Sequence, residues 1–376
     1  MQYRRFGKTN LNLSVFSLGT MRYLSSPRNA WETVNKAVEL GINHLETARG
    51  YGKSEEYLGL AIAKGLSIPR SQLYVTTKLS PTADAKTMSQ WIDSSLNRLN
   101  LDYIDCLGIH GINTWEHLDL ILLKDGCMQA VQEAIADRRV GHVGFSSHGS
   151  TELILAAIDT NLFEFVNLHY YYFFQQHQKA IERAAEKDMG IFIISPADKG
   201  GRLYTPPQTL KDLCDPFTPL ELNYRFLLSD RRITTLSVGA ANEDELTLPL
   251  QVADSTGELT SEEIDIFEGL QEHKDNALGT DKCSQCYACL PCPESINIPE
   301  VLRLRNLAVA YNMNEYGKYR YRMFENAGHW FPGKKGNRCT ECGECLPKCP
   351  ENLDIPNLLK DTHKRLQGEE GRRLWG

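Results

Sequence analysis

The sequence predicts an α/β fold: a (β/α)8 TIM barrel followed by a small, mainly helical second domain. Two observations lead to this prediction. Short apolar runs rich in β-branched residues alternate with stretches of helical period through the first three quarters of the chain. Beyond them, eight of the 11 cysteines lie after residue 280. We therefore expect a barrel over residues 1–275 and a cysteine-rich domain over residues 276–376.

The strand-like runs can be counted along the chain. They lie near residues 13–18, 42–47, 73–78, 103–109, 140–146, 165–169, 190–195 and 233–239. Eight β/α repeats in about 275 residues match the size of a (β/α)8 barrel. A doubly wound open sheet is the alternative that the same alternation of strands and helices allows.

The segments between these runs have helical features. Six residues of segment 88–99 recur at helical spacing and form one apolar face. They are Met88, Trp91, Ile92, Ser95, Leu96 and Leu99. Ser54, followed by Glu55 and Glu56, is expected to cap the N-terminus of another helix, because its hydroxyl can accept a hydrogen bond from the first turn.

The boundary between the two domains is placed by composition. Residues 271–279 are polar and end in Gly279, which suits the end of a helix and an exposed connection. Because the cysteine-rich region starts directly afterwards, we place the boundary near residue 276.

Charge and hydropathy argue against several classes of protein. The chain has 376 residues, and its 48 acidic and 41 basic side chains give a net charge of -7, so no overall positive field is present to hold a nucleic acid. No apolar run approaches the ~18 residues of a membrane span, and the first residues lack the apolar core of a secretory signal. We expect a soluble, cytoplasmic protein with no nucleic-acid or membrane partner. In a reducing cytosol its cysteines are expected to be metal ligands or free thiols.

The cysteines after residue 280 form two runs, at residues 283–292 and 339–349. The first run reads C-x2-C-x2-C-x2-C-P, with a gap before Cys292 one residue short of the usual spacing. The second reads C-x2-C-x2-C-x3-C-P, the spacing of bacterial ferredoxins with 4Fe-4S clusters. In two-cluster proteins the fourth cysteine of each run binds the other cluster. One cluster is thus expected on Cys283, Cys286, Cys289 and Cys349, and the other on Cys339, Cys342, Cys345 and Cys292. A structural zinc site is the alternative.

The two runs belong to an internal repeat. Each is followed by Ile-Pro and an apolar stretch. Pro299 and Pro356 are expected at the first position of a helix, where the missing N–H costs no hydrogen bond. The second domain is therefore predicted to be ferredoxin-like, with a cluster-binding loop and a helix occurring twice.

Basic side chains are concentrated between the two cysteine runs. They are Lys318, Arg320, Arg322, Lys334, Lys335 and Arg338. Only Glu315 and Glu325 oppose them within residues 311–338. A local positive patch suits the docking of an acidic electron donor such as a ferredoxin. The alternative is that these charges compensate the negative clusters or form a solvated face.

Four polar residues follow three consecutive strands of the predicted barrel. Glu46 and Tyr51 follow the second strand, Lys78 ends the third and His110 ends the fourth. The carboxyl ends of the strands form the rim where such barrels carry catalytic groups. Together with residues 3–20, these motifs resemble the aldo-keto reductase superfamily, and with the cysteine runs the chain resembles the iron–sulfur-containing subgroup over essentially its whole length.

The resemblance implies that the barrel reduces the carbonyl group of a small molecule. Tyr51 is then the general acid, but a free tyrosine, with a pKa of about 10, holds its proton too tightly for this work. Lys78 is the cation that favours the tyrosinate, and His110 orients the carbonyl or relays a proton. The family has an aspartate, one methylene shorter, where this chain has Glu46 to hold the lysine.

The resemblance also implies NADP(H) at the same rim. Ser146 and Asn167 match positions that hold the nicotinamide amide, although the family has a glutamine at the second of them. Gly239 and Asn242 lie in the loop after the eighth strand, which binds the phosphates of the nucleotide in the family. In that loop Glu245 stands where the family has an arginine for the 2′-phosphate, and a carboxylate repels this group. These departures argue against tight NADPH binding.

Two other features of the barrel have open interpretations. His148, after the fifth strand, either replaces a group that binds the nicotinamide amide or is only solvated. The aromatic residues 170–174 either line a substrate or cofactor pocket or pack in the core.

Two functions are consistent with the sequence. The first is an iron–sulfur oxidoreductase that reduces a carbonyl-type small molecule, with two 4Fe-4S clusters passing electrons. Its electron source is NADPH or ferredoxin, and a path from ferredoxin needs a two-electron gate such as a flavin, or radical chemistry of the substrate. The alternative is an electron-transfer or redox-sensing protein whose barrel is catalytically degenerate and binds no NADPH.

Overall fold

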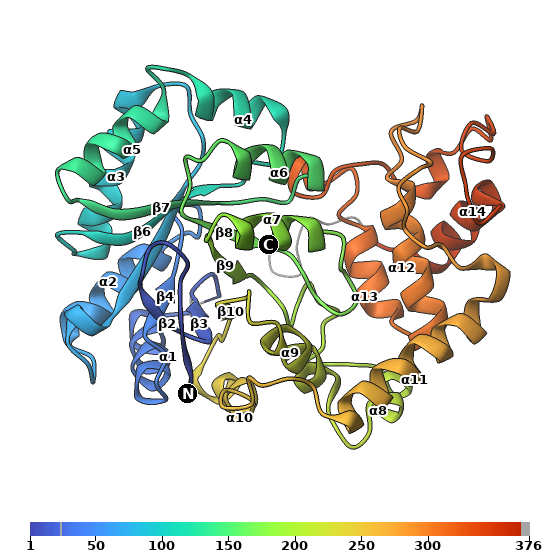
Figure 1. Ribbon diagram of the computed structural model, residues 1–376, viewed down its shortest axis with the longest axis horizontal. Helices are drawn as coiled ribbons and strands as arrows, with labels where there is room; N and C mark the ends of the chain where they lie inside the picture. Colours follow the sequence, from blue (N-terminus) through green and yellow to red (C-terminus); the bar gives the residue numbers. More distant parts are fainter. Residues whose placement is uncertain (23–24, 370–376) are drawn as a thin grey trace. The chain divides into compact units, whose positions relative to one another are not determined.

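The computed structural model describes residues 1–22 and 25–369. It contains a closed barrel of parallel strands, whose order can be followed in Figure 1. The strands are β3 (Phe16–Gly19), β4 (His44–Glu46), β5 (Tyr74–Leu79), β6 (Ile104–His110), β7 (Val140–Ser146), β8 (Phe165–Leu168), β9 (Gly190–Ile193) and β10 (Thr235–Val238). Each strand pairs with the next along the chain, and β10 pairs with β3 to close the barrel. The predicted (β/α)8 barrel is confirmed, and the open doubly wound sheet was the wrong alternative.

The first predicted strand, residues 13–18, is two strands. β1 (Tyr3–Arg5) and β2 (Asn12–Ser14) form an antiparallel hairpin, and the chain then enters the barrel as β3. The change of direction occurs at Val15, whose N–H donates to the carbonyl of Gln2 at 3.0 Å. The segment predicted as one strand thus contains a bend in the backbone at Val15.

Helices follow the barrel strands. They are α1 (Pro27–Glu39), α2 (Ser54–Lys64), α3 (Ala85–Leu99), α4 (Trp115–Leu122), α5 (Cys127–Ala136), α6 (Thr151–Asp159), α7 (Gln178–Glu186) and α10 (Thr247–Gln251). The predicted apolar face of α3 is buried at Met88, Ile92, Ser95, Leu96 and Leu99. Trp91 lies at the edge of this face, with the guanidinium carbon of Arg49 at 4.6 Å from its ring centroid.

The expected cap at Ser54 was wrong. Lys53 is the N-cap of α2, and Ser54 is the first residue of the helix. The Ser54 hydroxyl is fully buried and donates to the carbonyl of Thr20 at 2.9 Å, so it fixes the loop after β3 instead of the helix N-terminus. The acids Glu55 and Glu56 are in the first turn as predicted.

The barrel interior combines apolar packing with a small polar network. One buried cluster consists of Phe6, Leu13, Cys106, Phe165 and Phe192. His44 lies between Ser17 and Thr76, whose hydroxyl oxygens are 2.6 and 2.7 Å from its ring nitrogens. Burial lowers the pKa of His44 to about 3, and the histidine is therefore neutral at physiological pH.

The chain forms two compact units. The first comprises residues Met1–Gly200 and Asn223–Glu258, and the second Gly201–Leu222 and Leu259–Gly376. The helices of the second unit are α8 (Gln208–Cys214), α11 (Ser261–Leu278), α12 (Ile298–Tyr311), α13 (Asn314–Tyr321) and α14 (Ile355–Leu366), while α9 (Pro219–Ser229) runs from the second unit into the first. The residue near 276 at which we expected the domain boundary lies in the last turn of α11.

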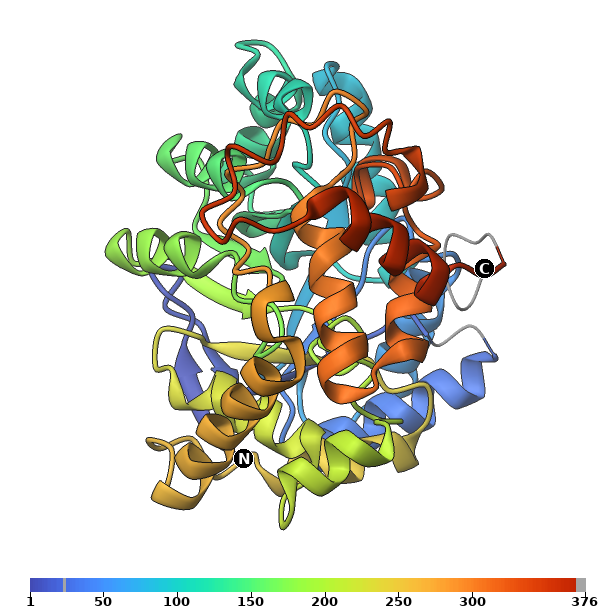
Figure 2. The same ribbon diagram turned by 90° about the vertical axis from the view of Figure 1, so that its right-hand side faces the viewer.

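The second unit is mainly helical, as predicted. Helix α12 packs against α11, α13 and α14, and Figure 2 shows α12 and α13 side by side. Asn297 caps α12 and Asp354 caps α14 in the same way, each side chain accepting a backbone N–H from the first turn. Pro299 and Pro356 occupy the second helical position and not the first, because each helix begins one residue earlier, at an isoleucine. Within the described residues, no helix is long and apolar enough to cross a membrane.

Candidate active site and cysteine cavities

A buried ion pair lies at the carboxyl ends of β4 and β5. Lys78 is 2% exposed and Glu46 is 4% exposed. The Lys78 ammonium donates to the Glu46 carboxylate in a short contact and to the carbonyl of Thr47 at 2.8 Å. Gly108 on β6 makes room for the lysine, because a Cβ there would lie 2.9 Å from the lysine Cγ. Burial lowers the pKa of Lys78 well below its ordinary value, and the carboxylate beside it opposes this effect.

Tyr51 and His110 lie at the same rim as this pair. The Nζ atom of Lys78 is 4.8 Å from the ring centroid of Tyr51. The Tyr51 and His110 rings meet edge to face, with centroids 5.7 Å apart and an interplanar angle of 84°. The structure thus brings together the four residues that the sequence singled out. The extra methylene of Glu46 does not separate its carboxylate from the lysine.

Two predicted nucleotide contacts lie on the neighbouring strands. His110, Ser146 and Asn167 form one row across β6, β7 and β8. The Ser146 hydroxyl oxygen accepts the N–H of Gly111 at 3.0 Å. Asn167 is 1% exposed, and the described residues offer no hydrogen-bond partner to either polar atom of its side chain. A buried amide without partners costs about 1–3 kcal/mol for each unsatisfied group, and so this side chain suits a polar ligand such as a carboxamide.

The loop after β10 uses its polar groups within the protein. The carbonyl of Gly239 accepts from Arg22 at 3.0 Å. The side-chain oxygen of Asn242 accepts the N–H groups of Asp244 and Glu245 and so caps a short turn. The carboxylate of Glu245 is paired with Arg22. These residues do not fit the phosphate end of NADP(H), because an anion of the chain already lies there.

A hydrogen-bonded cluster that the sequence did not predict follows β7, β8 and β9. The Tyr171 O–H donates to the carbonyl of Ile194 at 2.5 Å, so its oxygen accepts from Nδ1 of His169, also at 2.5 Å. A neutral His169 then presents Nε2 as an acceptor. Nε2 of His148 lies 3.1 Å from it and Nζ of Lys199 lies 3.4 Å from it. His148 is therefore held by a second imidazole, and its position after a strand end was the only signal in the sequence.

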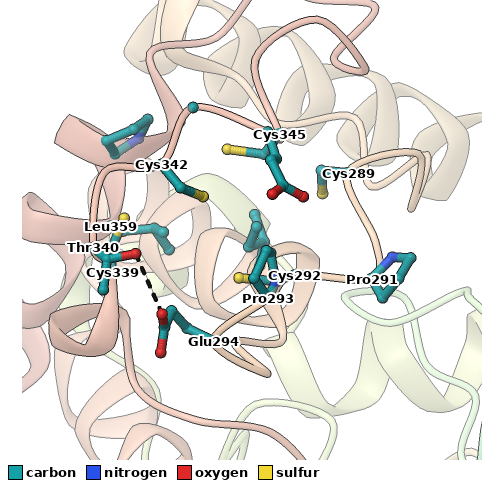
Figure 3. A pocket seen from close by; sticks show the side chains of 14 residues that line it. Cys289, Pro291, Cys292, Pro293, Glu294, Cys339, Thr340, Cys342, Cys345 and Leu359 are labelled. Carbon is teal, nitrogen blue, oxygen red and sulfur yellow. Dashed lines mark hydrogen bonds between the residues drawn. The ribbon is translucent and has the colours of Figure 1, made fainter.

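The eight cysteines of the second unit line two cavities. The first is lined by Cys283, Cys286, Cys289 and Cys349. The second is lined by Cys292, Cys339, Cys342 and Cys345, with Cys289 at its edge. Figure 3 shows this second cavity, with Cys292 from the first run and Cys342 and Cys345 from the second around it. The cavities divide the cysteines as the predicted ligand sets do, except that Cys289 lines both.

The chemistry of these cavities fits iron–sulfur clusters. Their other walls are largely apolar, including Leu302 and Ile355 in the first and Ile298 and Leu359 in the second. Among the residues that the structure describes, no three His, Cys, Asp or Glu side chains are arranged to hold a single metal ion. Thiolates spaced around a cavity are what a 4Fe-4S cubane requires.

Burial favours the protonated form of three thiols that line the cavities. Burial raises the pKa of Cys289 to about 12, and neighbouring cysteines add to the effect. Burial likewise raises the pKa values of Cys283 and Cys345. Iron binds thiolates, so these protons must be released when a cluster is inserted. The positive charge of the iron favours this deprotonation. Asn306 on α12 supports the first cavity by donating to the carbonyl of Cys283 at 3.0 Å.

A closed barrel with proton-transfer groups at its rim, linked to a domain with ferredoxin-type cysteine spacing, is the construction of an iron–sulfur oxidoreductase. The chain belongs to the aldo/keto reductase family, whose sequence pattern matches residues 16–272. A 4Fe-4S dicluster domain matches residues 282–353.

Similar proteins agree with this assignment. The oxidoreductase YqkF of Bacillus subtilis is 22% identical over 73% of this chain and 96% of its own length. Methylglyoxal reductase DkgA of Escherichia coli is 28% identical over 56% of this chain and 74% of its own length. The solved structure of aldo-keto reductase AKR11C1 from Bacillus halodurans, in its holo form, covers 71% of this chain and 95% of that chain with a TM-score of 0.63. At 23% identity this last likeness shows the fold alone.

Proposed function

We propose that this oxidoreductase reduces a carbonyl-type small molecule, with Tyr51 as the proton donor and two 4Fe-4S clusters passing electrons. The observation that carries the proposal is the buried Lys78–Glu46 pair, whose ammonium lies 4.8 Å from the ring centroid of Tyr51. A cation at this distance stabilises the tyrosinate that remains after proton transfer.

Each residue of the site has a distinct role in the proposed reaction. Tyr51 gives its proton to the carbonyl oxygen as negative charge develops there. Lys78 stabilises the tyrosinate and Glu46 holds the lysine in place. His110, whose ring lies against that of Tyr51, orients the carbonyl by a hydrogen bond. Ser146 and Asn167 hold the other groups of a ligand bound at this rim.

The electrons come from outside the barrel in this proposal. Reduction of a carbonyl to an alcohol consumes two electrons and two protons, whereas a 4Fe-4S cluster, when bound, supplies one electron at a time. The ligands are Cys283, Cys286, Cys289 and Cys349 for one cluster, and Cys339, Cys342, Cys345 and Cys292 for the other. A two-electron gate such as a flavin would deliver both electrons and the second proton to the carbon as a hydride. In stepwise transfer of single electrons to the substrate, the second proton would come from solvent. Such thiol-held clusters suit the reducing cytoplasm.

Reduced ferredoxin is the proposed donor, docking near residues 318–338. The patch is smaller than its sequence suggests. Arg320 is buried, with its guanidinium carbon 4.2 Å from the ring centroid of Phe331. Lys318 pairs with Glu315 at 3.0 Å. The exposed cations of this segment still outnumber its acids, so an acidic partner is the expected one.

The proposal is tested by anaerobic turnover. The iron-loaded protein is given reduced ferredoxin, or NADPH, and a panel of small aldehydes and ketones. We expect substrate-dependent oxidation of the donor that the Tyr51→Phe variant loses by at least a hundredfold, because the general acid is gone. Tyr57→Phe is the matched control, since Tyr57 on α2 makes no side-chain hydrogen bond within the described residues. Equal turnover by wild type and Tyr51→Phe would rule out Tyr51 as the acid.

The alternative function is an electron-transfer or redox-sensing protein with an inactive barrel. The observation in its favour is the ion pair between Glu245 and Arg22 in the loops after β10 and β3, where NADP(H) would place its phosphates. It predicts clusters that are reduced and reoxidised normally while no carbonyl compound accelerates donor oxidation. The turnover measurement therefore separates the two functions.

A further inference from the structure

An anion of the protein lies at one edge of the barrel rim. Strands β3 and β10 are neighbours, so the loops that leave their carboxyl ends lie side by side. Arg22 belongs to the loop after β3, and Glu245 to the loop after β10, which is the eighth strand of the barrel. The loops after the seventh and eighth strands are a common place for phosphate groups in (β/α)8 barrels.

The carboxylate of Glu245 is held as a phosphate group would be held. One oxygen accepts from Nη1 of Arg22 at 2.7 Å, and the other accepts from Nη2 at 3.2 Å. The first oxygen also accepts the backbone N–H of Ala241 at 3.1 Å. A two-pronged guanidinium together with a backbone N–H is the donor set that carboxylates and phosphates share.

The loops around this contact are fixed by other hydrogen bonds. Arg22 also donates to the carbonyl of Gly239 at 3.0 Å, and this bond orients the guanidinium group independently of Glu245. Asn29 on α1 donates to the carbonyl of Ala241 at 2.8 Å. Asn242 accepts the backbone N–H of Glu245 and so sets the position of that residue. The donors are therefore pre-positioned, and only the Glu245 side chain has to move for another anion to enter.

We propose that Arg22 and the N–H of Ala241 form a site for a phosphomonoester and that Glu245 blocks it. The carboxylate competes in two ways: it occupies the donors, and its charge repels an incoming phosphate. Because both side chains are more than a third exposed, the contact is weak enough for substitution to open the site. The barrel consequently disfavours nucleotides with a 2′-phosphate. This inference concerns binding alone and does not depend on the carbonyl reduction proposed above.

Isothermal titration calorimetry of the iron-loaded full chain with two probes tests the inference. The probe 2′,5′-ADP carries the 2′-phosphate, and 5′-AMP lacks it. We expect wild type to show no preference for 2′,5′-ADP. Glu245→Gln is expected to prefer it by roughly tenfold or more, because two charge-assisted hydrogen bonds from Arg22 become available and the repulsion is removed.

Two further variants make the test specific. Glu243→Gln removes the same charge from the same turn at an exposed residue, which makes no ion pair with Arg22 in the part of the chain that the structure describes, and it should behave as wild type. The double variant Arg22→Ala/Glu245→Gln should lose the gained preference. The inference is overturned if wild type already prefers 2′,5′-ADP, if Glu245→Gln gains nothing, if Glu243→Gln gains as much, or if the gain survives without Arg22. Iron content and circular dichroism show that each variant is folded and loaded.

Discussion

Removing the charge of Glu46 leaves a buried ammonium without its counter-ion. In Glu46→Gln the Lys78 side chain, 2% exposed in the wild type, keeps only neutral acceptors among its wild-type partners: the amide oxygen at position 46 and the carbonyl of Thr47. Breaking a buried ion pair by removing one partner costs about 3–5 kcal/mol. For a barrel of this size the loss corresponds to a fall in melting temperature of roughly 10 °C. Thermal unfolding followed by far-UV circular dichroism measures it.

The effect depends on pH in a direction that the structure fixes. Burial lowers the pKa of Lys78 from its ordinary value of 10.5, and loss of the carboxylate lowers it further. The unfolded chain then binds more protons than the folded chain between the lowered pKa and 10.5, so stability of the variant rises with pH across this window. The deficit against wild type should fall as pH rises from the Lys78 pKa of the folded variant to the higher Lys78 pKa of the folded wild type, because the variant loses the proton first.

Two companion variants separate charge from packing. Glu46→Asp keeps the charge and should lose less stability than Glu46→Gln. The double variant Lys78→Met/Glu46→Leu removes both charges and should recover most of the stability, since apolar replacement of a buried pair is often neutral or stabilising. It should have no carbonyl reduction. A Glu46→Gln protein as stable as wild type at pH 7, or a deficit that does not fall as pH rises, would refute this account of the pair.

Three other predictions concern the second unit. Cys349→Ala and Cys292→Ala should each reduce bound iron from about eight to about four atoms per chain, because each removes a ligand from a different cavity, as measured by iron analysis. Asn306→Leu should lower iron content after anaerobic dialysis against a chelator, since the amide holds the carbonyl of Cys283, whereas an unchanged loss rate would show that this bond does not support the cavity. Cys214, whose pKa burial raises to about 12, should resist alkylation at pH 8 in the folded protein and react on unfolding, as followed by mass spectrometry.

The barrel was predictable because its signals are local. Strands buried on both faces read as short apolar runs, and seven of the eight expected runs each correspond to one barrel strand. Residues 13–18 were predicted as one strand because the hairpin strand and the barrel strand are similarly apolar, and nothing in the sequence marks the bend at Val15 between them. Ser54 failed for a similar reason. Its hydroxyl bonds with Thr20 and Thr47, which only the folded chain brings near, and the helix begins at Ser54 itself.

The sequence predicted a site residue only where its position directly after a barrel strand is enough to place it at the rim. Tyr51, Lys78 and His110 follow consecutive parallel strands, so their convergence follows from topology. Arg22 lies 223 residues from Glu245, and no pattern in the chain announces that the two meet. The same limit applies to His169, which reaches His148 from the end of β8, and to Lys199, which reaches His169 from the loop after β9.

The buried Lys78–Glu46 ion pair also helps to decide whether the barrel is catalytically active or degenerate. Two charges taken out of water destabilise a fold, and apolar residues of the same volume would serve a scaffold at least as well. Lys78 and Glu46 nevertheless lie almost fully buried beside Tyr51, and Gly108 lacks the Cβ that would collide with the lysine. A barrel that only presents a surface needs none of this, whereas a tyrosine that must release a proton needs the cation. The cost of the pair therefore favours catalysis, even though Glu245 blocks the phosphate end, and it directs the search for the reductant to the iron–sulfur unit.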